Sequence, residues 1–519
     1  MDKNLTMTYE EHIREQEQRQ EEQKKQKDGA AEIFRRLGLA SLLYGAVYTF
    51  CLYQNLTGIT SALWAVVSVC YLFYVIKSSG RAWKKDSWFL TAVLVLLGIS
   101  NFLTGNLWIV CLNYLVMFVL LVGILLHNFY EDITWDFGKY GKELAAAVFG
   151  AIGKCFTPFS DGEAFLKKYE IGKNKKTSYI LAGIGIALPL VLILTGLLCQ
   201  ADLVFEDMIG RILKNITFPR RMFGILFMMC FGFFSSYCGV RYIGLHSREE
   251  RVEQKTGAEP LLAIALLGTV LIVYLIFCGI QVFYLFLGAG TLPQGVTYAD
   301  YARTGFFQLL FICLLNVAAV LMIKKYFREN KGLNVCLITV CGCTFIMTAS
   351  SAYRMLLYIS AYCLTVLRCF VLVALLAIAV IMAGVTIFIV KKEFPLLKFT
   401  VAALCIIYTG CSFVRMDYII ADYNLNHWTG KAEAIDYGYI ACLSTDAAPV
   451  VAEYGRKHPG VQKKYELWRE EAAAGITSEW DGDFWYYQYW TENQAAMEEQ
   501  SLRRFNVSHY QAARLLGEL

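Results

Sequence analysis

The sequence lacks the short signatures of the common soluble enzymes. It contains no HExxH, GxSxG, Walker A or GxGxxG motif, and no Cys/His set with the spacing of a metal site. Its six histidines lie outside the hydrophobic runs, so none stands in mid-membrane as a proton relay. These absences provide no candidate catalytic residue, no expected metal or cofactor, and favour a role other than that of an enzyme.

Charged residues are also scarce. Asp, Glu, Lys and Arg make up 18% of the chain and hydrophobic residues 57%, whereas soluble domains average about 25% charged. No hydrophobic run has a carboxylate near its centre, which argues against a proton- or sodium-coupled pump. We also expect no cleavable signal peptide, because a long charged leader precedes the first run near Leu37.

What the sequence does have is long hydrophobic runs. A helix of about 20 apolar residues crosses the hydrocarbon core of a bilayer. We count eleven runs of this kind, at 37–55, 58–76, 88–104, 107–126, 178–200, 222–243, 261–287, 305–323, 333–350, 366–390 and 396–414. The predicted fold class is therefore all-α: a polytopic helical membrane protein with about eleven transmembrane helices and a small helical extramembrane C-terminal domain.

The runs divide the chain into three predicted parts. Residues 1–36 form a charged cytoplasmic leader, helical or disordered. Residues 37–416 form a transmembrane helix bundle, with interfacial helices near 142–156 and 203–216. Residues 417–519 form an extracellular helical tail domain.

Orientation follows from the distribution of Lys and Arg. With the N-terminus inside, the inner segments carry 31 Lys and Arg residues and the outer loops carry 7. Such a bias is typical of cytoplasmic loops. An odd number of spans then puts the tail outside. We therefore predict a multi-pass protein of a bacterial plasma membrane with a cytoplasmic N-terminus and an extracellular C-terminus.

The tail is acidic and aromatic. It carries 9 basic and 16 acidic residues, and its stretch SEWDGDFWYYQYWTENQ includes Trp480, Trp485 and Trp490. These rings favour one of three roles: a face that binds sugar or a partner, a rim of aromatic residues against the membrane, or a packed core. A packed core is the most common of the three.

The candidate binding residues are polar side chains at the outer edge of the membrane. An unpaired arginine in apolar sequence is costly, so partners are expected, and Asp202 and Asp300 are the nearest candidates. One interpretation is a vestibule that binds an anionic headgroup or small anion, and the other is ion pairing that holds the loops together. The set is Asp202, Gln281, Tyr284, Tyr298, Asp300, Tyr301, Arg303, Arg354, Tyr358 and Arg368.

Several segments resemble a bacterial family of integral membrane proteins, domain of unknown function 4173. The similar segments, between about residues 180 and 519, are GIQVFYLF, TLPQGVTYADYARTGFFQL, RMLLYISAYCLTVLR, FVRMDYIIADYNLNHW, IDYGYIACLSTDAAPVV and RRFNVSHYQAARLL. Cys363 departs from the resemblance, which has glycine there. The resemblance implies a bacterial plasma-membrane protein and assigns no activity.

Three functions remain open from the sequence. The first is a structural, sensory or accessory envelope protein whose external tail binds a partner. The second is a transporter or flippase with an outward-facing, arginine-lined anion site. The third is a membrane-embedded enzyme of envelope lipid or glycan that uses Asp202, Asp300 or a carboxylate of the tail. Expected partners are the lipid bilayer and an envelope protein, glycan or anionic lipid at the external face, with no nucleic acid.

Overall fold

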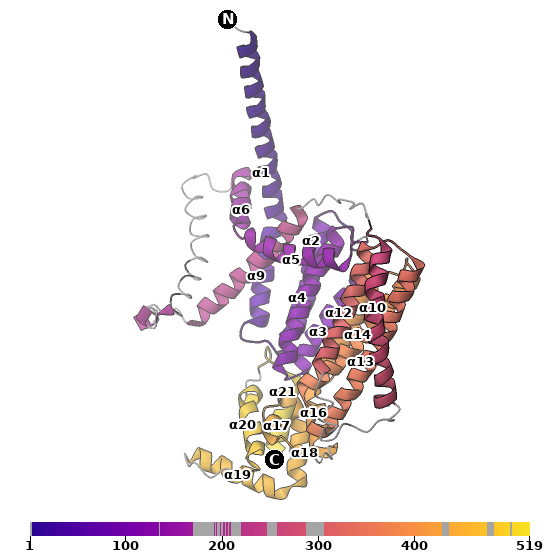
Figure 1. Ribbon diagram of the computed structural model, residues 1–519. Coiled ribbons are helices and arrows are strands. Elements are labelled where there is room, and N and C mark those ends of the chain that lie inside the picture. Colours follow the sequence, from indigo (N-terminus) through magenta and orange to yellow (C-terminus); the bar gives the residue numbers. More distant parts are fainter. Residues whose placement is uncertain are drawn as a thin grey trace. The chain divides into compact units, whose positions relative to one another are not determined.

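The computed structural model is built from helices (Figure 1). It describes residues 3–133, 135–169, 220–245, 257–286, 306–427, 435–474, 482–498 and 501–518, with scattered positions between 191 and 208. Across these ranges no strand occurs, and the only extended pairing is an isolated bridge between Ala258 and Phe327. The all-α fold class is confirmed.

Eight helices in the described part of the chain are long and apolar enough to cross a membrane. They are α2 (Thr60–Ser78), α4 (Leu107–Phe129), most of α9 (Arg220–Leu245), α10 (Pro260–Ile280), α12 (Phe306–Tyr326), α13 (Lys331–Tyr362), α14 (Val366–Val390) and α15 (Leu396–Phe413). The apolar helix α3 (Ser87–Leu103) is shorter. The predicted run at 37–55 falls in the end of α1 (Lys3–Leu52), and the run at 178–200 lies mostly outside the described residues. The count of eleven is therefore not confirmed.

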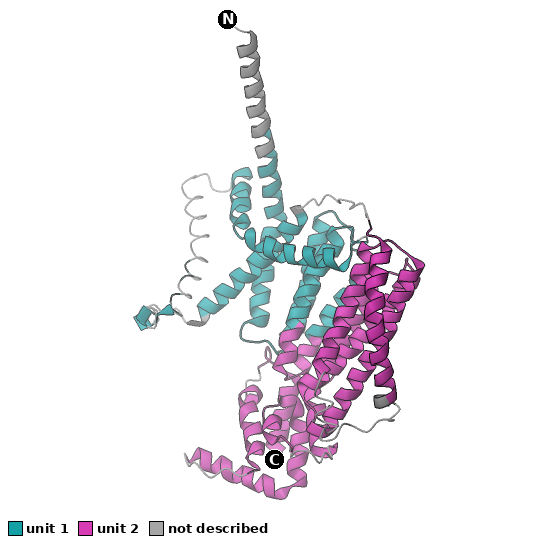
Figure 2. Cartoon of the chain, viewed as in Figure 1, with its two compact units in different colours: residues 1–98, 114–248 teal, residues 99–113, 249–519 magenta. Residues whose placement is uncertain are grey.

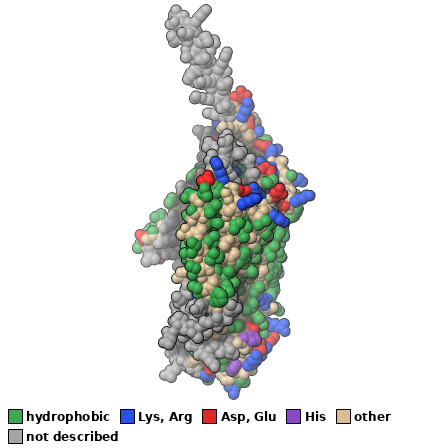
Figure 3. Space-filling view, turned by 45° about the vertical axis from the view of Figure 1, so that its right-hand side comes forward, with side chains coloured by type: hydrophobic (Ala, Val, Ile, Leu, Met, Phe, Trp, Pro, Cys, Tyr) green, Lys and Arg blue, Asp and Glu red, His purple; other side chains and the backbone are tan. Residues whose placement is uncertain are grey.

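The surfaces of these helices are apolar where they face away from the protein. Along α10 the outward side chains are leucine, isoleucine and valine, including Leu261, Leu266 and Ile276, each more than half exposed. Figure 3 shows a broad area of hydrophobic side chains, with charged side chains gathered beyond its ends. Large exposed apolar areas of this kind are rare on soluble proteins and are expected where lipid covers the surface. The protein is thus a multi-pass membrane protein.

The chain divides into two compact units (Figure 2). Unit 1 comprises residues 1–98 and 114–248, and unit 2 comprises residues 99–113 and 249–519. Helices α3 and α4 therefore each contribute to both units. Residues 99–113 contain the turn between these two helices, and this turn belongs to unit 2.

Unit 1 is organised around α1, which packs on α9, α6 (Thr157–Lys168) and α2. Helices α1 and α9 approach closely at Gly45 and Gly232, where an added Cβ would lie under 3.0 Å from the backbone of the other helix. Small residues permit such close crossings in membranes. Helix α5 (Phe137–Gly153), which contains most of the predicted interfacial helix, also packs on α9. Most of the predicted helix at 203–216 lies outside the described residues.

A buried ion pair connects α6 to α9 within unit 1. Asp161 accepts hydrogen bonds from Arg241 Nε at 2.7 Å and from the Tyr237 hydroxyl at 2.8 Å. All three side chains are largely buried. Removing one member would leave a buried charge without its partner, which is strongly destabilising.

Unit 2 combines five apolar helices with the helices of the C-terminal region. In the bundle α13 packs on α10, α12 and α14, and α14 packs on α15. The C-terminal helices are α16 (Met416–Asp422), α17 (Tyr437–Ala441), α18 (Ala448–Lys457), α19 (Pro459–Ala473), α20 (Phe484–Glu498) and α21 (Val507–Glu518), with short helices η2 (Tyr423–His427) and η3 (Thr445–Ala447) between them.

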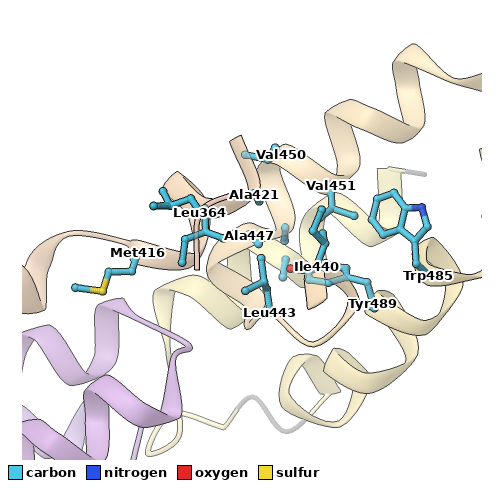
Figure 4. Packing of buried hydrophobic residues seen from close by; sticks show 14 of the residues in the cluster. Leu364, Met416, Ala421, Ile440, Leu443, Ala447, Val450, Val451, Trp485 and Tyr489 are labelled. Atoms are coloured by element: carbon cyan, nitrogen blue, oxygen red, sulfur yellow. The ribbon is translucent and has the colours of Figure 1, made fainter. Parts of the chain in front are cut away.

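A hydrophobic cluster forms the core of the C-terminal region and continues into the helix ends of the bundle (Figure 4). It joins Leu364 of the α13–α14 turn to Ile440 of α17 and Val451 of α18. Tyr489 and Trp490 of α20 are essentially fully buried within it. The aromatic stretch is therefore mainly packed core, although Trp480 lies outside the described residues.

Candidate functional site

The predicted outer polar patch is only partly described. Tyr298, Asp300, Tyr301 and Arg303 lie outside the described residues, as does the side chain of Tyr284. Asp202 is exposed, and its carboxylate accepts hydrogen bonds from the backbone N–H groups of residues 204 and 205. It belongs to unit 1, whereas the other described members belong to unit 2. The interpretation of the ten residues as a binding site stays a prediction.

Arg354 and Gln281 form one contact within the predicted set. Arg354 is buried on α13, and its guanidinium donates to Gln281 Oε1 at 3.2 Å. Ser350, one turn earlier, donates to the same oxygen at 2.6 Å. Gln281 begins η1 (Gln281–Phe286), the π-helical extension of α10. The amide oxygen therefore connects α10 to α13, because both donors come from α13.

Arg368 and Tyr358 form a second contact. The Arg368 guanidinium carbon lies 4.2 Å from the centroid of the Tyr358 ring, within the range of a cation–π interaction. Its Nη1 also donates to the backbone carbonyls of Tyr362, at 2.6 Å, and Cys363. These carbonyls end α13, so the cation of α14 satisfies acceptors at a helix C-terminus.

The most connected polar cluster lies elsewhere, at the α3–α4 turn. Asp446 of η3 is 1% exposed and accepts hydrogen bonds from the Thr104 hydroxyl and from the Gly105 N–H, the latter at 3.0 Å. We call Thr104, Gly105, Asn106, Asp417, Asp446 and Asn506 the turn cluster; all of them except the half-buried Gly105 are buried. It joins the α3–α4 turn to three separate parts of the C-terminal region.

Asp417 of α16 contacts the other side of the same turn. Its Oδ2 accepts from Asn106 Nδ2 and from the Ser444 N–H, both at 3.0 Å. Asn106 in turn accepts the Ile109 N–H and so caps the start of α4. The Asp417 side chain is buried, and its Oδ1 has no hydrogen-bond partner among the described residues.

Asn506 fastens the last helix to this turn. Its Nδ2 donates to the carbonyls of Thr104 at 2.9 Å and Asn101 at 3.3 Å, while its Oδ1 accepts the His509 N–H. One buried side chain therefore satisfies carbonyls at the end of α3 and an N–H at the start of α21.

Gly105 is required by the close fit of the turn against η3. A Cβ at this position would lie 2.1 Å from Thr445 Oγ1 and 3.2 Å from Ser508 Oγ. These two hydroxyls are themselves hydrogen-bonded at 2.8 Å. The turn is consequently packed against both η3 and α21 with no space for a larger residue.

The α13–α14 turn is held in a similar way. Asn424 of η2 accepts the Leu364 N–H at 2.7 Å and donates to the Leu364 carbonyl at 2.9 Å. The Tyr439 hydroxyl of α17 accepts the Val366 N–H at 2.9 Å. The C-terminal region therefore binds two turns of the bundle through side chains that replace missing backbone partners.

Burial sets the electrostatics of the turn cluster. Desolvation raises the pKa of Asp417, and the charge of Asp446 raises it further, although hydrogen bonds from Ser444 and Asn106 oppose the shift. Burial and the two carboxylates also raise the pKa of Tyr489 well above its usual value. Burial lowers the pKa of His509, although Asp446 opposes this effect.

The chemistry of the cluster is that of a structural network. Among the described residues no group of three His, Cys, Asp or Glu side chains could hold a metal ion. The carboxylates accept hydrogen bonds from a hydroxyl, an amide and backbone N–H groups, and the bonds from Thr104, Gly105 and Asn106 join the α3–α4 turn to the C-terminal region. Such fully buried polar networks fix one arrangement of packed elements.

Our sequence analysis did not identify this cluster. Asp417 follows the last hydrophobic run by three residues, and Asn101, Asn106 and Asn113 fall in or between two early runs. Polar side chains in such positions are costly unless they have partners. Their presence in the sequence therefore indicates that each has a hydrogen-bond partner in the fold. That Asp446 and Asn506 supply partners depends on contacts more than 300 residues apart in sequence.

Comparison with known proteins yields one match. Residues 91–454, more than half of the chain, match the model of a family described as domain of unknown function (DUF4153), and these residues include Asp417 and Asp446. No curated protein and no solved structure matches. The resemblance to domain of unknown function 4173 was wrong, because the matching model is that of a different family. The chain belongs to the DUF4153 family.

Proposed function

We propose that this protein is a structural or accessory component of a bacterial plasma membrane, and that its C-terminal region binds an envelope partner on the outer side. The observation that carries the proposal is the turn cluster. Two buried carboxylates and Asn506 hold the C-terminal helices on the α3–α4 turn. A binding region fixed in this way is presented at a defined place and orientation relative to the membrane.

The arginine contacts favour this role over that of an anion transporter or flippase. Arg354 contacts Gln281, and Arg368 contacts Tyr358 and two backbone carbonyls. Groups that already satisfy protein partners are less available to a passing anion. The same reasoning argues against a membrane enzyme, since Asp417 and Asp446 accept hydrogen bonds that maintain the fold.

Helix α19 provides the most suitable surface for the partner. Its inward residues Val461, Tyr465 and Trp468 are buried, whereas Leu467 is 54% exposed beside the exposed carboxylates Glu466 and Glu470. In a protein-binding surface on α19, Leu467 would supply the apolar centre and the two glutamates the polar rim.

In-cell photo-crosslinking of the full-length chain tests the proposal. A photoreactive amino acid replaces Leu467, and the control replaces the lipid-facing Leu262 of α10, which is 65% exposed. We expect a discrete adduct with an envelope protein or glycan from position 467 only, and its loss in the Glu466→Ala/Glu470→Ala background. Absence of a specific adduct at 467, or persistence of the adduct in that background, contradicts a partner site on α19.

A further inference from the structure

The loop before α21 lies at the level where the apolar helices end. Asn506, the residue that follows this loop, donates to the carbonyl of Thr104, directly after the last residue of α3. Apolar helix α4 begins at Leu107 on the other side of the same turn. The position of residue 506 relative to the bundle is therefore fixed at one end of two apolar helices.

The loop itself presents an unusual side-chain pattern. Leu502 is 93% exposed, the largest exposed fraction among the exposed large hydrophobic residues of the described chain. Arg503 and Arg504 follow it directly. Phe505 is half-buried, and its ring lies 5.9 Å from that of Tyr510, which is 53% exposed. We call residues 501–505 the anchor loop.

The reach of the chain allows this loop to enter the headgroup layer. Leu502 and Asn506 are four positions apart in the chain, a separation of at most about 14 Å. The interfacial layer of a bilayer is roughly 5–7 Å thick on each side of the hydrocarbon core. Leu502 is thus within reach of the boundary between headgroups and acyl chains.

Neighbouring residues of α4 continue the same pattern. Trp108 is 79% exposed and Leu107 56% exposed, within one helical turn of Asn106. Tryptophan and tyrosine are enriched at this depth because their rings are amphipathic. Exposed apolar side chains therefore occur both in the anchor loop and at the start of α4, the two segments that Asn506 and the α3–α4 turn connect.

We propose that the anchor loop inserts into the bilayer that the bundle spans. Leu502 enters the boundary between headgroups and acyl chains, where it loses contact with water. Arg503 and Arg504 lie at the depth of the phosphates of anionic lipids, and a guanidinium, with five N–H donors, can contact a protein partner and a phosphate together. This anchor holds α21 on the membrane whichever partner the C-terminal region binds, and it does not depend on the proposed function.

Lipid photo-crosslinking tests the anchor. The full-length protein is placed in vesicles of phosphatidylethanolamine and phosphatidylglycerol, and a benzophenone amino acid replaces Leu502. The matched control replaces Leu467, an exposed leucine of the same region on α19. We expect lipid adducts at 502 and only background at 467. Equal yields at both positions, or a protein adduct with a second copy in place of lipid, overturn the proposal.

Charge substitutions test the role of the arginines in the same assay. The double variant Arg503→Gln/Arg504→Gln removes two charges, each contributing about 1 kcal/mol near an anionic surface, or about fivefold in binding. We expect the preference of the Leu502 adduct for phosphatidylglycerol over phosphatidylethanolamine to fall at least fivefold. An unchanged preference overturns the assignment of the arginines to lipid phosphates. Thermal unfolding measured beside each variant separates this effect from misfolding.

Discussion

At the scale of single residues, the buried carboxylates and amides of the turn cluster connect more elements of the fold than Arg354 and Arg368 do. Asp417 and Asp446 are 2% and 1% exposed and together accept hydrogen bonds from four donors. Leaving any of those donors unpaired would cost about 1–3 kcal/mol each. Asp417 differs from Asp446 because one of its carboxyl oxygens lacks a partner among the described residues.

Asp417 should make stability depend on pH. Burial raises its folded-state pKa above the ordinary 3.8, so its stabilising effect is full below that value. The contribution is lost as the pH rises through the folded pKa. Asp417→Asn preserves the shape and has no proton to lose. We expect the Tm difference, wild type minus variant, to decrease as the pH rises above 3.8.

Thermal unfolding in detergent at a series of pH values measures this difference. The control is Glu453→Gln on α18, whose carboxylate is exposed and pairs with Lys457. Its Tm difference from wild type should change little with pH. A difference for Asp417→Asn that is equally flat would contradict a raised pKa.

Substitution of Cys363 tests the positive φ of its backbone. Its φ is 70° and ψ 173°, a region that costs a residue with a side chain about 1–3 kcal/mol and that glycine adopts readily. We expect Cys363→Gly to be more stable than Cys363→Ala by about 1–2 kcal/mol, although alanine is normally preferred near helices. Chemical denaturation of both variants gives the comparison. Greater stability of the alanine variant would show that this φ is not maintained.

At the scale of elements, helix ends determine how the C-terminal region docks. Asn106 caps α4, Asn506 caps α21, and Asp436 accepts the Tyr439 N–H to cap α17. Two of these caps also contact another element, so local helix termination and tertiary docking use the same side chains. Substitution of one such residue should therefore weaken both the end of its helix and the docking of the C-terminal region.

The fit of Gly105 against Thr445 can be measured by a double-mutant cycle. Gly105→Ala forces a Cβ against Thr445 Oγ1 and should destabilise by about 1–3 kcal/mol. Thr445→Ala removes that oxygen and its bond to Ser508, at a cost of about 1 kcal/mol. The double variant should cost less than the sum, because the clash is gone. Strict additivity of the unfolding free energies would mean that the two residues are not in contact.

At the scale of the whole molecule, the charge distribution predicts orientation. Under the eleven-span topology predicted from the sequence, the segments expected inside carry 31 Lys and Arg residues and the loops expected outside carry 7. We expect alkaline phosphatase fused after Leu519 to be active, and fluorescent protein at the same position to be dark. Fused in the basic loop at Glu329, alkaline phosphatase should be inactive and the fluorescent protein should be fluorescent. Fluorescence at the C-terminus would reverse the tail and move the proposed partner to the cytoplasm.

The class of the protein follows from its amino-acid sequence alone. Runs such as 107–126 and 366–390 must be helices in lipid, because only a helix satisfies its own backbone hydrogen bonds there. The helices α4 and α14 accordingly match these runs closely. For the aromatic stretch around Trp490, a packed core was the favoured one of three interpretations, and Trp490 is buried. Helix formation and burial are local properties, and periodicity and composition report them.

The polar residues that connect the elements of the fold could be identified only from the packed structure. The pattern of polar residues at the membrane edge predicted Arg354 and Arg368 as candidate binding residues. The most connected polar cluster, however, is formed around Asp417 and Asp446. The partners of Asp446 lie at residues 104 and 105, more than 300 positions away. A polar side chain in apolar sequence shows that a partner must exist. Its identity depends on which helix ends the packed chain brings together.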